Sequence, residues 1–162
     1  PAPASGRRDI EASRSRLTES LELRRQLGIG EESGTTLTLL AVVLILSSDP
    51  SAANSAVMEA LTTGLALRDR RAAWSLDVAA CLAALEDQPD RALRLEGAAA
   101  AVFEVTAQSP PPAWRQFTAQ LMERARRELG DERSSQALAA GRGMGFEQAL
   151  EYAIERAHAA TN

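Results

Sequence analysis

The sequence predicts an all-α protein, and three observations support this fold class. Hydrophobic residues make up 45% of the 162 residues but aromatic residues only 4%, so the core must be built from Ala, Leu and Val, which suits closely approaching helices. Most apolar segments show helical spacing rather than strict alternation. Glycines and prolines divide the chain into segments of helical length. A chain of this size suits one domain with a substantial core.

The first expected helix runs from Ile10 to Leu27, where a few apolar residues lie among arginines and glutamates. Gly28 and Gly30 end it. The residues before it begin PAPASG and resemble a linker or a cloning remnant, so we assign residues 1–9 to such a segment.

Segment 35–48 is ambiguous, because its many β-branched residues would suit a strand. Its length and the helical spacing of its leucines favour a helix. Asp49 and Pro50 then end this segment and open a third helix, expected over 51–69, with the proline at an early helical position.

Further helices are expected after this point, with the clearest break at the three prolines 110–112. Their expected ranges are 72–87, 91–108, 113–129, 132–140 and a last helix from Phe146. We therefore expect a single helical-repeat domain over 10–160, with repeats over about 10–109 and capping helices over 113–160.

Small residues recur with a period of about 40 residues, within the range typical of solenoids. The positions are Ser13, Ala53 and Ala92; Ser20, Ala60 and Ala99; and Ala41 and Ala80. Such residues let one helix approach its partner, and stacked pairs complete a core that no pair could bury alone. These small residues resemble the tetratricopeptide pattern, and the resemblance implies antiparallel helix pairs in a right-handed superhelix with C-terminal capping helices.

Several segments resemble the C-terminal tail of large bacterial transcriptional regulators, the multidomain ATPase-containing LuxR-like and AfsR-like proteins, some of which have a cyclase-like or kinase domain. The segments are SLELRRQLG (20–28), DQPDRALRLEGAAAAVFE (87–104), PPAWRQF, RRELGDERSSQALAAGRGM and FEQALEYAIE. The resemblance implies a helical sensor or interaction module whose ATPase and DNA-binding domains lie elsewhere in the polypeptide. Glu96 departs from the repeat, which usually has a large apolar or aromatic residue there.

Composition argues against several classes of partner. The net charge is −4, and all 18 basic residues are arginines without a basic stripe, so we expect no direct binding to nucleic acid. The longest apolar run, 37–48, is shorter than the roughly 20 residues of a membrane helix, so we expect no membrane segment. The single cysteine, Cys81, excludes an internal disulfide and fits a cytoplasmic protein.

The glycines of GRGMG, 141–145, are the only hint of a phosphate loop, but the chain has no lysine and the spacing fits neither nucleotide motif. We interpret Gly141 as a helix C-cap and Gly145 as an N-cap. His158 is expected at the surface near the C-terminus and Cys81 in the core. The sequence therefore predicts no catalytic, metal or cofactor site, and no enzyme.

The function that we expect is a noncatalytic protein-interaction or regulatory scaffold that binds a protein, a peptide or other domains of its parent protein. A concave face would provide the contact; its residues would be Thr38, Val42, Trp74, Asp77 and Cys81. A small-molecule effector sensor is the alternative, which a sizeable pocket with convergent polar groups would favour. Homodimer formation is a third hypothesis, which an exposed apolar face would favour.

Overall fold

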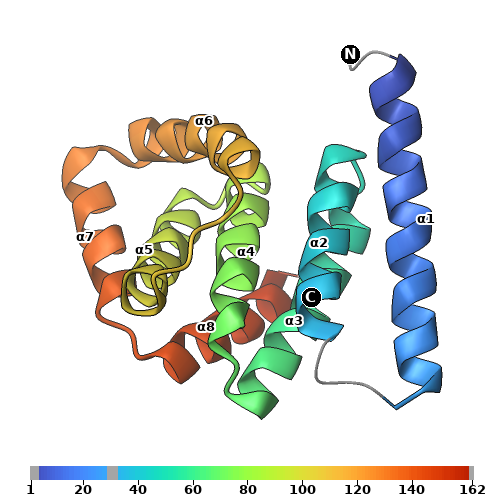
Figure 1. Cartoon of the computed structure of the whole chain (residues 1–162). Coiled ribbons are helices and arrows are strands. Elements are labelled where there is room, and N and C mark those ends of the chain that lie inside the picture. The colour runs from blue at the N-terminus through green and yellow to red at the C-terminus, as the bar shows by residue number, and fades with distance from the viewer. Residues whose placement is uncertain (1–3, 29–32, 161–162) are drawn as a thin grey trace.

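The computed structural model describes residues 4–28 and 33–160, and this part of the chain is all α-helical with no strand. Eight helices and one 3₁₀ turn follow one another (Figure 1). Their bounds are α1 Ala4–Gln26, α2 Ser33–Leu46, α3 Pro50–Leu67, η1 Arg70–Ala72, α4 Ala73–Leu85, α5 Pro89–Thr106, α6 Pro112–Leu129, α7 Asp131–Arg142 and α8 Phe146–Ala160.

The structure confirms the all-α class, including the helix over the ambiguous segment 35–48. Asp49 closes the turn after it and caps α3, because its carboxylate accepts the backbone N–H of Ala52 at 3.2 Å and Pro50 occupies the first turn. Helix α1 differs from the expectation, since it begins at Ala4 rather than Ile10 and so includes most of the segment assigned to a linker. Residues 1–3 lie outside the described residues.

Helices α2 and α3 form one closely packed pair, and α4 and α5 form another, with neighbouring helices antiparallel. The small residues of the repeat lie where these helices meet; Ala41, Ala53, Ala60, Ala80, Ala92 and Ala99 are at most 1% exposed. This burial confirms the predicted role of the small positions in α2 to α5, because an alanine side chain lets two helix backbones approach closely. The expected register does not extend to α1, where Ser13 is exposed and Ser20 is only partly buried.

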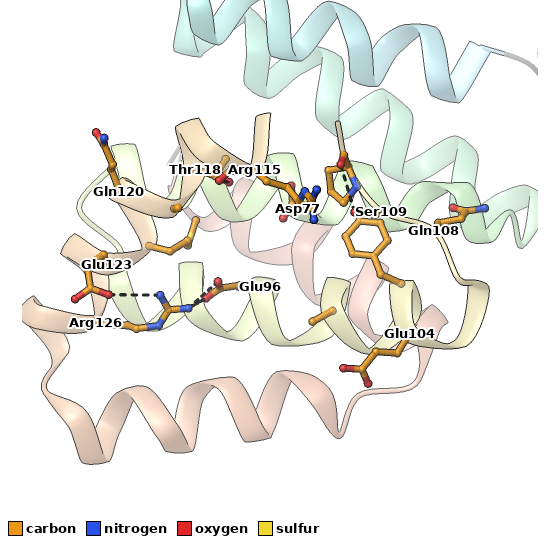
Figure 2. Close-up of a pocket in the computed structure, with 15 residues that line it drawn as sticks. Asp77, Glu96, Glu104, Gln108, Ser109, Arg115, Thr118, Gln120, Glu123 and Arg126 are labelled. Carbon is orange, nitrogen blue, oxygen red and sulfur yellow. Dashed lines mark hydrogen bonds and ion pairs between the residues drawn. The ribbon is translucent and has the colours of Figure 1, made fainter. Parts of the chain in front are cut away.

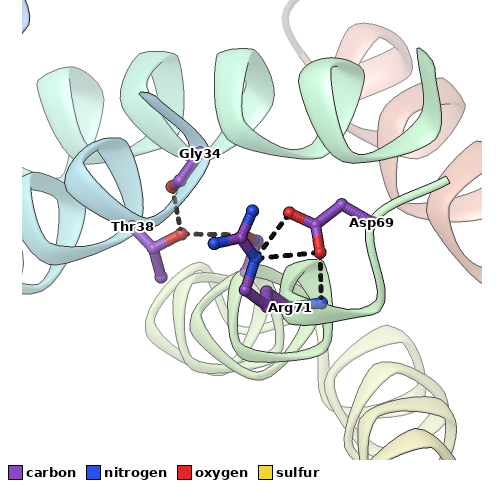
Figure 3. A network of polar contacts seen from close by, with 5 residues as sticks. Gly34, Thr38, Asp69 and Arg71 are labelled. Carbon is purple, nitrogen blue, oxygen red and sulfur yellow. Dashed lines mark hydrogen bonds and ion pairs between the residues drawn. The ribbon is translucent and has the colours of Figure 1, made fainter. Parts of the chain in front are cut away.

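A buried hydrogen bond connects the two pairs. The Thr38 hydroxyl on α2 lies 2.8 Å from the Ser75 hydroxyl on α4, and it also donates to the carbonyl of Gly34 (Figure 3). Both hydroxyls therefore have partners although they are almost fully buried.

The contact between α5 and α7 depends on two glycines. A Cβ added to Gly97 would lie 2.3 Å from the carbonyl oxygen of Leu138, and one added to Gly141 would lie 1.9 Å from that of Arg94. Gly141 is therefore not the C-cap that we expected, because α7 continues to Arg142 and Gly141 is buried against α5. The absent side chain lets the two helix backbones touch.

Gly145 does occupy the N-cap of α8, as predicted. Its carbonyl accepts the first helical N–H, from Ala149, at 2.9 Å, and its own N–H donates to the Gln148 side chain at 3.4 Å. Helix α8 then turns back and packs on α3 as well as on α4 and α5, so the chain end contacts helices from much earlier in the sequence (Figure 1).

Helix α6 packs on α4, α5 and α7, and α1 lies at the opposite edge of the molecule, mainly against α2 (Figure 1). None of the helices in the described ranges is both long and apolar enough to cross a membrane.

Candidate ligand-binding pocket

A cavity of about 770 Å³ lies among α4, α5, α6 and the segment that joins α5 to α6. It opens to solvent, and its apolar lining includes Ala100 and Phe103 of α5, Met122 of α6 and Pro110 of the connecting segment. Polar and charged side chains converge on the same space from all three helices (Figure 2). The volume falls in the range of small-molecule sites, about 300–1,000 Å³.

Asp77 is the acidic group that α4 contributes to the pocket. Its Oδ2 accepts a hydrogen bond of 2.6 Å from Nε1 of Trp114 on α6. Burial raises the pKa of Asp77 from its ordinary value of 3.8 to about 6; the hydrogen bond from Trp114 opposes this rise and the charge of Glu96 adds to it. At neutral pH the pocket therefore contains a carboxylate that is mostly ionised but poorly solvated.

Glu96 and Arg126 form an ion pair between α5 and α6 on the pocket wall. Nη2 of Arg126 donates to both carboxylate oxygens of Glu96, at 2.7 and 2.8 Å, and Nη1 lies 3.8 Å from Glu123 (Figure 2). Burial raises the pKa of Glu96, although the positive charge and hydrogen bonds of Arg126 oppose the rise. Two carboxylates thus offset the charge of Arg126.

Arg115, on the first turns of α6, is the second guanidinium of the pocket, and it is exposed. Among the described residues, no carboxylate oxygen lies within 4.0 Å of the Arg115 guanidinium. No cationic nitrogen of these residues lies within 4.0 Å of the Asp77 carboxylate. The two groups therefore face the same cavity as unpaired charges of opposite sign, one at a partly buried position and one in solvent.

The lining as a whole is acidic. Its carboxylates are Asp77, Glu96, Glu104 and Glu123, and its cations are Arg115 and Arg126, so the formal charge of the lining is −2. Arg142, outside the lining, pairs with Glu104 and reduces the charge at that end of the pocket.

The five residues predicted for a concave binding face lie in different places. Thr38 is 2% exposed and Cys81 is 0% exposed, so neither can touch a partner unless the core opens. Val42 and Trp74 are partly buried and pack against the hydrophobic core, and Trp74 Nε1 has no hydrogen-bond partner among the described residues. Only Asp77 lines the pocket.

The α6 wall of the pocket was not predicted from the sequence. Glu96 and Arg126 are 30 residues apart, and Asp77 and Trp114 are 37 apart, so no local pattern joins either pair. One signal was present, because Glu96 occupies a position where the repeat usually has a large apolar residue. A charged group there requires a partner from another helix.

Three other features do not add a candidate site: Cys81, a small further cavity and Gly141. Burial and the nearby charge of Asp77 raise the pKa of the Cys81 thiol to about 12, so it stays protonated and unreactive. A further cavity, lined by residues that include Arg71 and Ser75, has a volume of only about 10 Å³, about the room for one water. Gly141 is packed against α5, which leaves no phosphate cradle at that position.

The fold and pocket define an all-α helical protein with an acidic, partly apolar cavity. No known protein family, no curated protein and no solved structure matches the chain.

Proposed function

We propose that this chain is a noncatalytic regulatory module that binds a small-molecule effector in the pocket between α4, α5 and α6. The main support is the 770 Å³ cavity, in which partly buried polar groups converge above apolar side chains. Such a pocket favours the effector sensor over the peptide-binding scaffold, the other role that the sequence suggests. The resemblance to LuxR-like and AfsR-like tails supports a place in a bacterial transcriptional regulator.

The antiparallel pairs α2–α3 and α4–α5, with their small residues in corresponding positions, support the tetratricopeptide-like part of the proposal. The return of α8 to α3 differs from an array in which each repeat contacts only its neighbours. Helix α8 contacts both pairs and so holds α4–α5 against α2–α3. A ligand bound between α4 and α6 would therefore affect the packing of both pairs.

Two carboxylates with raised pKa in one pocket are also a pattern of acid–base catalysis. Here Glu96 is held by Arg126, and Asp77 accepts the Trp114 hydrogen bond. The lining contains no histidine, cysteine or lysine that could act beside them. A binding role needs no further group in the lining, whereas acid–base catalysis would need an additional catalytic side chain.

A second role, contact with other domains or a second copy, is favoured by exposed leucines at the other edge of the molecule. Leu23 and Leu27 at the end of α1 are 51% and 70% exposed, and Leu39 and Leu46 of α2 are exposed as well. A regulatory module needs such an output surface in addition to a ligand site. Light scattering tests whether these leucines support a homodimer.

The effector proposal is tested by melting the protein against a panel of small metabolites, because a ligand that binds the folded state raises its melting temperature. A bound compound should also shift backbone NMR signals around Asp77, Phe103 and Thr118. The variant Ala119→Trp fills the pocket from its exposed wall, and Ala140→Trp places the same ring on an exposed part of α7 outside it. An effector should lose affinity for the first variant and keep it for the second; equal binding to both contradicts the proposal.

A further inference from the structure

The charges of the pocket indicate which ligands it can accept. Arg126 is offset by Glu96 and Glu123, so its guanidinium is already occupied. Arg115 has no ion-pair partner among the described residues, but it is exposed and keeps its hydration at little cost. Asp77 also lacks a counterion in this part of the chain, and it is the less solvated of the two groups.

A carboxylate in this position gains more from a ligand cation than an exposed one does. Water stabilises the Asp77 charge poorly, and the only described hydrogen bond to it, from Trp114, uses Oδ2. An ammonium or guanidinium group can donate to the remaining oxygen and supply the missing charge in a site of reduced dielectric constant. The net negative charge of the lining also attracts cations toward the pocket.

The apolar part of the lining gives the second requirement. Phe103 contributes an aromatic ring, and Ala100 and Met122 contribute aliphatic surface in the same cavity. These groups can bury a hydrocarbon body, and an aromatic ring additionally attracts a cation placed over its face.

We propose that the effector is a small organic cation whose ammonium or guanidinium group pairs with Asp77 while its apolar body packs on Ala100, Phe103 and Met122. This inference rests on the proposed function, because it specifies the ligand class of the same pocket. A small molecule is favoured over a lysine or arginine side chain of a peptide because the cavity has the volume of a complete small-molecule site.

The test compares four compounds of similar body: phenethylamine and phenethylguanidine as cations, phenethyl alcohol as the neutral analogue, and hydrocinnamate as the anion. Affinity is measured by calorimetry at pH 7.5 and by the shift of the Trp114 indole N–H signal, which reports on Asp77 directly because the two groups are hydrogen-bonded. Trp74 serves as the internal reference, since it does not line the pocket. We expect the two cations to bind and to shift the Trp114 signal.

The matched variants are Asp77→Asn and Asp87→Asn. The first removes the pocket charge and keeps the shape and an acceptor for Trp114; binding of the cations should weaken about tenfold or more. The second removes an exposed carboxylate outside the pocket at a positive-φ position that asparagine tolerates, and it should bind like the unchanged protein.

Binding of the cations should also fall as the pH is lowered through about 6, because a proton on Asp77 removes the charge that attracts them. The other charged groups around Asp77 are Glu96 of α5 and Arg115 of α6, with Cys81 on its own helix. Cys81 does not titrate below pH 8, so the Asp77→Asn variant separates the contribution of Asp77 from that of Glu96.

Three results would overturn the inference: no binding of either cation, equal binding of the alcohol or the anion, or undiminished binding by Asp77→Asn. Binding of the neutral or anionic compound that Ala119→Trp abolishes would reject the cation and leave the effector pocket standing. If neither these compounds nor the metabolite panel bind, the proposed function fails as well. Binding of acetyl-Gly-Lys-Gly-amide without binding of the free cations would replace the small molecule by a peptide and so also reject the inference.

Discussion

Replacing Asp77 by asparagine should make the protein more stable at pH 8. The folded state raises the pKa of this carboxyl from 3.8 to about 6, mainly through burial, so the folded protein holds the Asp77 proton more tightly than the unfolded chain does. Its contribution to the free energy of unfolding is therefore fully present below about pH 4 and is lost as the pH rises through about 6. At about 1.4 kcal/mol per pKa unit, the loss amounts to about 3 kcal/mol.

Asparagine has nearly the shape of the protonated acid and never ionises, so the Asp77→Asn variant should keep the stability that the unchanged protein loses. It still offers an amide oxygen to Trp114, but its NH₂ group needs a partner, which reduces the expected gain at pH 8 to about 2 kcal/mol. Near pH 4 this gain disappears, because Asp77 is then protonated in the folded state, and the unpaired NH₂ group should leave the variant about 1 kcal/mol less stable than the unchanged protein.

Urea unfolding at pH 4.5, 6 and 8, followed by far-ultraviolet circular dichroism, measures this difference. Other carboxylates also titrate in this range, so the relevant quantity is the difference between the two proteins at each pH. Asp87→Asn serves as the control, because Asp87 is exposed and its removal should give a small, pH-independent change. A difference for Asp77→Asn that stays constant with pH, or a variant less stable at pH 8, would refute the argument.

Further predictions concern the helix contacts and the core. Gly141→Ala should destabilise the protein by about 2 kcal/mol, because the new Cβ would lie 1.9 Å from a carbonyl oxygen of α5, and the urea midpoint measures it. Arg126→Gln should destabilise it by about 2 kcal/mol, because Glu96 then remains partly buried without its cation, and should raise the pKa of Glu96 in an NMR titration. Cys81 should resist iodoacetamide at pH 8 in the folded protein and react once urea unfolds it.

Each of these predictions has a direct control. Gly143→Ala places its Cβ no closer than 3.5 Å to other atoms, so it should change stability little, and an equal loss for both glycine variants would contradict the contact between α5 and α7. Arg124→Gln removes an exposed cation and should have a much smaller effect than Arg126→Gln. Rapid labelling of Cys81 without denaturant would show that the core around it opens easily.

Two effects are expected for Asp77→Asn, a gain in stability and a loss of cation binding. Both follow from removing the poorly solvated charge of Asp77. A charged group that lowers stability and lines a pocket is a common feature of binding sites, where the ligand provides the missing stabilisation. A variant that becomes more stable without losing any ligand would separate the two effects and weaken the link between Asp77 and function.

The amino-acid pattern was sufficient for the helices and most of their ends. Asp49 and Pro50 mark the start of α3 through contacts within one turn, and the small residues Ala41 and Ala80 mark the faces that meet other helices. These features are readable because they depend on neighbours at most a few residues away, or on a periodicity that burial imposes. The early start of α1 at Ala4 is the main difference, since PAPASG resembled a linker.

The pocket and the role of Gly141 could not be foreseen in this way. A glycine near a helix end is equally typical of a helix cap and of a close contact between two helices. Only the tertiary structure, in which α5 contacts Gly141, distinguishes the two roles. Asp77 meets Trp114, and Glu96 meets Arg126, only because α6 lies across α4 and α5. Crossing angles between helices arise from the packing of many side chains at once, so the groups that share a cavity, and the charge left unpaired within it, are properties of the folded chain.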